Sequence, residues 1–243
     1  TGSQNVYVGA FAGQGYSGQD QSENTAVGYK ALMDIQSGTA NVAIGNNALE
    51  NATTATVNTA VGGEAMSGIT TNAVQDAVAI GHSAFKGSSS TTTGTNGTVA
   101  VGHDALKVLT SGAANTAVGY AAGIYTTTAG SNTYVGYEAG KGVDGTPQTS
   151  GNNVAIGQGA GTLLQGSAIS NTFVGTASGN SVTTGTKNVI IGTLADTNTA
   201  TGTNQTVIGY NAVGQGDNVV VLGDANVTHV CLGHEGATAV AKA

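Results

Sequence analysis

Short apolar pentads that end in glycine recur along almost the whole chain. Asn-Thr-Ala-Val-Gly stands at 24–28, 58–62 and 115–119, and Asn-Val-Ala-Ile-Gly stands at 41–45 and 153–157. Twelve glycines follow a Val or Ile in this way, and successive copies lie 17 to 21 residues apart. They are Gly9, Gly28, Gly45, Gly62, Gly81, Gly102, Gly119, Gly136, Gly157, Gly175, Gly192 and Gly209. A period this short and regular indicates a repeat array.

Side chains alternate within each pentad. With the glycine as position 0, position −1 is always Val or Ile, and position −3 is always Val or Thr. Position −2 is mostly Ala, with Tyr7, Tyr134, Phe173, Ile190 and Val207 as exceptions. β-branched residues spaced by two are typical of a strand, because successive side chains leave opposite faces. We therefore predict one short strand in each repeat, with positions −1 and −3 facing the interior.

The residues that flank the strand predict a coil that turns and returns. Asn occupies position −4 in nine of the twelve copies, and it tolerates left-handed backbone angles at a corner. Stacked Asn side chains can also form an amide ladder. Position +3 is Ala in every copy except Ser178, and in all copies but one an apolar residue or Gly follows it. Each repeat therefore supplies a second apolar position, on a returning arm that can pack against the strand.

A single short strand cannot bury its own apolar face, so the coils must stack. Parallel stacking at about 4.8 Å per step covers each strand with the next and creates one continuous core. The sequence thus predicts an all-β fold, a parallel β-solenoid of about 12 coils and a rod roughly 55–60 Å long. We expect the repeat domain over 1–212. We expect a tapering C-terminal end over 213–243, where the glycine spacing falls to 14 and then 10 residues.

Position −2 forms a second apolar column on the face opposite positions −1 and −3. If the β-branched column is interior, this column of Ala, Tyr, Phe and Ile lies outside. Exposed apolar stripes usually mark an interface, and closed symmetry would cover the stripe in every copy. We therefore predict a homo-oligomer that assembles through position −2.

The pentads resemble the head repeats of the trimeric autotransporter adhesins, the YadA-like head, which also occur in phage tail fibres and other bacterial surface fibres. The resemblance covers about residues 5–212. It implies a left-handed parallel β-roll, three chains side by side as a homotrimer, and an extracellular role in attachment on a bacterial surface or a virion tail fibre. The implied ligand is a glycan or protein on a host cell, a prey cell or the extracellular matrix.

Composition and charge exclude several other classes. The chain has 243 residues, with 40 Gly and one Pro, which does not fit collagen. Its net charge of −7 is dispersed, and it lacks the cationic face that nucleic acids or anionic membranes require. No stretch approaches the ~20 apolar residues that span a bilayer, so we expect no direct membrane insertion.

Few residues suggest catalysis or cofactor chemistry. The chain has four histidines and one cysteine, and no Ser/His/Asp set stands out, so we expect neither an enzyme nor a cofactor. His229, Cys231 and His234 are candidate metal ligands, because three copies of Cys231 near one axis could bind a soft metal. The alternative is a small buried thiol beside a solvated histidine.

Position +1 carries the candidate ligand contacts. Tyr and His there combine a flat ring with a polar tip, which suits contacts with sugars or proteins. The candidates are Tyr29, His82, His103, Tyr120, Tyr137 and Tyr210. They could instead form a packing ladder that shields the strand ends. Two functions follow: an attachment module that binds through this column or its loops, or a structural spacer rod whose binding tip lies outside this chain.

Overall fold

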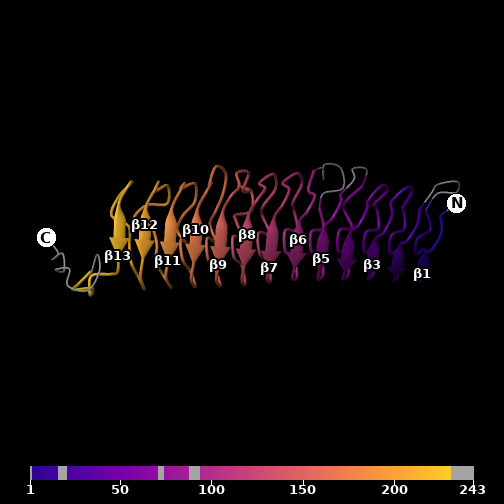
Figure 1. Ribbon diagram of the computed structural model, residues 1–243, viewed down its shortest axis with the longest axis horizontal. Coiled ribbons are helices and arrows are strands. Elements are labelled where there is room, and N and C mark those ends of the chain that lie inside the picture. The colour runs from indigo at the N-terminus through magenta and orange to yellow at the C-terminus, as the bar shows by residue number, and fades with distance from the viewer. Residues whose placement is uncertain (1, 16–20, 71–73, 88–93, 231–243) are drawn as a thin grey trace, which may run out of the picture.

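Thirteen short strands form one parallel sheet in the computed structural model, which describes residues 2–15, 21–70, 74–87 and 94–230. The strands follow chain order, and β1 and β13 lie at opposite ends of a long rod (Figure 1). Their bounds are β1 Val6–Val8, β2 Thr25–Val27, β3 Val42–Ile44, β4 Thr59–Val61, β5 Val78–Ile80, β6 Val99–Val101, β7 Thr116–Val118, β8 Thr133–Val135, β9 Val154–Ile156, β10 Thr172–Val174, β11 Val189–Ile191, β12 Thr206–Ile208 and β13 Val220–Leu222.

The register confirms the stacked pentads. Each strand pairs with the next so that equivalent positions face one another, as Ala26 faces Ala43 and Val27 faces Ile44. The prediction of an all-β parallel solenoid of about twelve turns is therefore confirmed. The sheet also continues through β13, which pairs with β12 inside the segment expected to taper. Within the described ranges, no helix has the length and apolarity needed to cross a bilayer.

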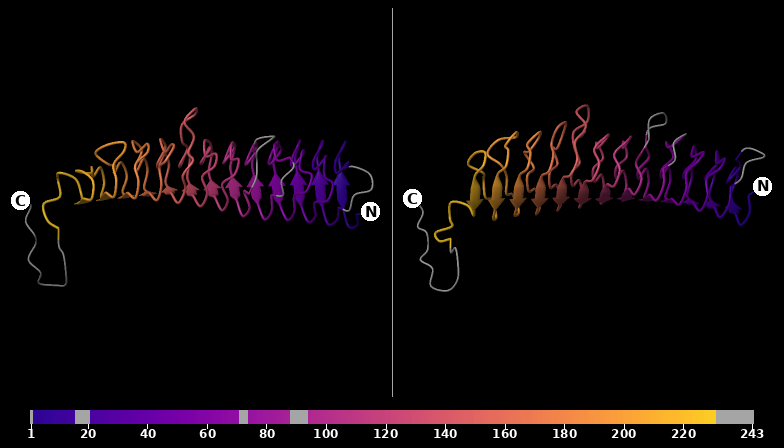
Figure 2. Two further views of the ribbon diagram at one scale, coloured as in Figure 1. Left: turned by 90° about the horizontal axis from the view of Figure 1, so that it is seen from above. Right: turned by 45° about the horizontal axis from the view of Figure 1, so that its top comes forward.

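The buried face of the sheet is the opposite of the one predicted. The returning arms cover one face of the sheet (Figure 2), and position −2 lies beneath them: Ala26, Ala43, Tyr134 and Phe173 are fully buried. Positions −1 and −3 point away from the arms. Ile156, for example, is 39% exposed. The prediction of a Val/Ile interior was wrong, and so was the prediction that position −2 forms an oligomer interface.

The interior is too narrow for branched side chains on both walls, which explains the reversal. Small residues at −2 leave room for positions +3, +4 and +7 of the returning arm, such as Ala48, Leu49 and Ala52. Where −2 is aromatic, position +4 is glycine. A Cβ on Gly179 would lie 2.6 Å from the Phe173 ring, and one on Gly161 in the preceding coil would lie 2.8 Å from it. Because the interior is closely packed, an aromatic side chain at −2 leaves no room for a side chain at +4.

The asparagines at position −4 form the predicted ladder inside the coil. Asn171 donates from its backbone N–H and its Nδ2 to Oδ1 of Asn153, both at 3.0 Å, and Asn188 repeats this pattern on Asn171. Asn171 Nδ2 also donates to the Gly185 carbonyl at 2.8 Å. These side chains are buried, and the ladder satisfies backbone and amide groups together. The left-handed corner lies one residue earlier, at position −5, as at Ser170 (φ 59°).

Candidate functional site

The position +1 side chains lie in one exposed column along the rod, just beyond the ends of the strands. Each follows the column glycine, whose φ of about +130 to +140° ends the strand and turns the chain. Coil stacking then places successive +1 side chains beside one another. Tyr29 and Tyr120 are each 46% exposed, Tyr137 is 51% exposed and Tyr210 is 67% exposed.

Four of the six candidates form a continuous strip. The rings of His82, His103, Tyr120 and Tyr137 follow strands β5 to β8 and are nearly parallel. Adjacent ring centroids lie 5.1, 5.4 and 5.2 Å apart, with 19°, 20° and 11° between ring planes. We call these four residues the ring strip. It presents a flat row of aromatic groups with polar atoms, which is suited to stacking against a planar or sugar ligand.

Tyr29 and Tyr210 lie apart from the ring strip. Tyr29 instead makes an edge-to-face contact with Phe11, with ring centroids 5.9 Å apart, and the Lys30 ammonium lies 5.6 Å from its ring centroid. Residues without rings occupy position +1 on either side of the strip. The column is therefore several separate surfaces, of which the ring strip is the largest.

Charged side chains at position +2 line the ring strip, and sequence analysis did not select them. The Lys86 ammonium lies 2.7 Å from the Glu64 carboxylate, and this hydrogen bond and charge hold the pKa of Glu64 below its ordinary value. The Lys107 ammonium lies 3.2 Å from Asp104, and Lys141 lies 2.9 Å from Glu138. The recurrence of acids two residues after the column glycine was the signal available in the sequence.

A polar groove of about 680 Å³ begins beside the ring strip. Its walls come from successive coils and include Asn47, Glu64, Lys86 and Thr127. Glu64 joins the two features, because its carboxylate lies 3.5 Å from the hydroxyl of Ser83, next to His82. The groove supplies donors and acceptors near the aromatic rings.

The predicted C-terminal metal ligands are only partly described. His229 is exposed, and its Nδ1 lies 3.0 Å from the Thr228 hydroxyl. Cys231 and His234 lie outside the described residues. Another group of possible ligands, His82, His103 and Asp104, lies at one end of the ring strip, and its ligand atoms are within 4.8 Å of one another.

Comparison with known proteins adds no relative: no protein-family model matches the chain, and no curated protein does either.

Proposed function

We propose that this chain is a non-enzymatic segment of a trimeric extracellular fibre, which attaches a cell or a virion to a glycan or protein on another surface. The observation that carries this proposal is the ring strip. Four solvent-facing rings in register form a contact surface along the ends of strands β5 to β8. The pentads' resemblance to the YadA-like head repeat supports the same role, and the left-handed sense of the coil rests on that resemblance.

The ring strip suits a sugar better than an apolar ligand. The tyrosine and histidine rings offer apolar faces, while their hydroxyl and nitrogen atoms form hydrogen bonds with ligand hydroxyls. The polar groove beside Glu64 and Lys86 adds fixed donors and acceptors. We therefore favour a surface glycan as the ligand within this proposal.

The trimer in this proposal uses the sheet face that the returning arms leave uncovered. Positions −1 and −3 form this face, and several of the residues at position −1 are more than a third exposed, including Ile80, Val118 and Ile191. An apolar stripe of this length marks an interface, and cyclic symmetry would cover it in each chain. In such a trimer the three sheet faces meet, and each ring strip stays outside that contact, at the ends of its own strands.

The second candidate function is a structural spacer rod of a phage tail fibre or bacterial fibre whose binding tip lies outside this chain. The observation that favours it is the uniformity of the solenoid: one short strand recurs in every coil, and Asn holds position −4 in nine of twelve coils. A spacer needs stiffness and length, and repeat stacking supplies both.

Binding to glycan and matrix-protein arrays tests the two functions. We expect the isolated rod to bind a defined set of glycans, and Tyr120→Ala to weaken binding at least tenfold, which is about 1.4 kcal/mol. Leu163→Ala is the matched control, because Leu163 is 42% exposed but lies in a returning arm. An absence of binding on every array supports the spacer function, and equal effects of both variants contradict a role for the ring strip.

A further inference from the structure

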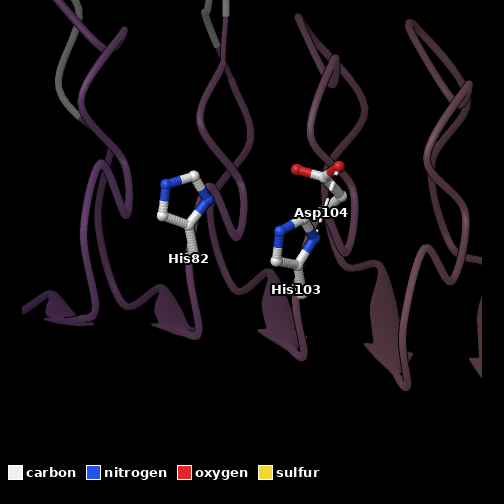
Figure 3. A group of neighbouring side chains, drawn as sticks. All are labelled: His82, His103 and Asp104. Carbon is white, nitrogen blue, oxygen red and sulfur yellow. Dashed lines mark ion pairs between the residues drawn. The ribbon is translucent and has the colours of Figure 1, made fainter.

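Two histidines and an aspartate from adjacent coils meet at one end of the ring strip (Figure 3). His82 follows β5, whereas His103 and Asp104 follow β6. The two imidazole rings stand side by side with centroids 5.1 Å apart, and Oδ2 of Asp104 lies 3.4 Å from Nδ1 of His103. One ligand atom from each of the three residues lies within 4.8 Å of the other two. The cluster is open to solvent, so an ion can enter freely.

Neighbouring side chains hold two of the three groups in place. The Ser83 hydroxyl lies 3.1 Å from Nδ1 of His82, which is the ring nitrogen that points toward His103 (Figure 3). The Lys107 ammonium lies 3.2 Å from Oδ1 of Asp104, which leaves Oδ2 facing His103. A contact to the remote oxygen of a carboxylate ligand, such as the one that Lys107 makes, orients the ligand and adjusts its basicity. The arrangement therefore has the outer contacts of a metal site as well as the inner donors.

We propose that His82, His103 and Asp104 bind a divalent first-row transition ion, with Zn²⁺ as the reference case. Two imidazole nitrogens and one carboxylate oxygen are donors that suit Zn²⁺, Ni²⁺ and Cu²⁺, whereas Mg²⁺ and Ca²⁺ prefer all-oxygen sites. Three protein ligands leave a fourth tetrahedral position open for water or for an oxygen of a bound ligand. This inference does not depend on the proposed attachment function.

Binding requires a small local closure that the geometry permits. Zn–N and Zn–O bonds of about 2.0–2.2 Å bring tetrahedral ligand atoms to roughly 3.3–3.5 Å from one another. The present separations, up to 4.8 Å, must therefore shrink by rotation of the exposed imidazole rings. The backbone need not move, because stacking already brings the two coils into register at β5 and β6.

Isothermal titration calorimetry of the full chain with zinc chloride tests the proposal. His229, Cys231 and His234 are the competing source of binding, so the titration uses a background variant with His229→Ala, Cys231→Ser and His234→Ala. In this background we expect one ion per chain. We expect His82→Ala and His103→Ala each to weaken zinc binding at least tenfold. Gln158→Ala, which removes an exposed side chain from the same column, should leave the affinity unchanged.

Three results would overturn the proposal. The first is no zinc binding in the background variant at millimolar zinc. The second is unchanged affinity after His82→Ala or His103→Ala, because the site needs both coils. The third comes from nuclear magnetic resonance of the unmutated chain during a zinc titration. We expect the imidazole signals of His82 and His103 to shift together, and the proposal fails if either signal stays in place. That measurement needs no substitution at the site, so it remains decisive if a variant folds poorly.

Discussion

Replacing a column glycine by alanine should destabilise the rod through contact with the next coil. Gly45 has φ of +136°, and a Cβ there would lie 2.5 Å from the carbonyl oxygen of Gly62 and 2.6 Å from its carbonyl carbon. Backbone strain at such a φ costs about 1–3 kcal/mol. Forcing an extra methyl against fixed backbone costs about 1–3 kcal/mol more. We therefore expect Gly45→Ala to lower the free energy of unfolding by roughly 2–6 kcal/mol.

Gly216 separates the two contributions. Its φ is +144°, close to that of Gly45, but an added Cβ would meet nothing within 4 Å. Gly216→Ala should therefore show the backbone strain alone, about 1–3 kcal/mol. Urea unfolding followed by far-ultraviolet circular dichroism measures both variants. If Gly45→Ala is no more destabilising than Gly216→Ala, the close approach of successive glycines does not limit the fold and our reasoning fails.

Three further predictions concern the ladder, the core and the sheet face. Asn171→Ala should lower the free energy of unfolding in urea by about 1–3 kcal/mol, because it leaves buried hydrogen-bond partners unsatisfied. The control Asn46→Ala removes an exposed side chain and should change that free energy by no more than about 0.5 kcal/mol. Burial raises the pKa of Tyr134, so the neutral hydroxyl stabilises the fold fully below pH ~10, and this contribution falls as the pH rises further. Tyr134→Phe should therefore reduce the loss of unfolding free energy with pH above pH ~10. An unchanged slope would contradict this. Ile156→Asp places a charge on the proposed trimer face, so light scattering should show folded monomers. Leu163→Asp changes a returning arm and should leave the trimer intact. Trimers of both variants would refute the proposed interface.

The Asn ladder and the stacked register could be predicted because each depends on local repetition. Every coil carries a variant of one pentad, so only an in-register parallel stack places like positions together, as Asn153, Asn171 and Asn188 show. The ring strip was predictable in the same way, since His103 and Tyr120 are one coil apart. The approach of Asp104 to His82 was not, because the two residues hold different positions, +2 and +1, and the sequence does not say which way a side chain at +2 points.

The sequence by itself determined the strands, their spacing and the positions that share a face. Only the tertiary structure decided which face is buried, because a period of two distinguishes the two sides of a strand without saying which is inside. Within a narrow coil the arm residues need room, so Ala at −2 faces inward and the larger Val and Ile remain outside, as at Ala155 and Ile156. One sequence feature reflects this burial: an aromatic residue at −2 occurs with glycine at +4, as at Phe173 and Gly179, because both positions share the narrow interior.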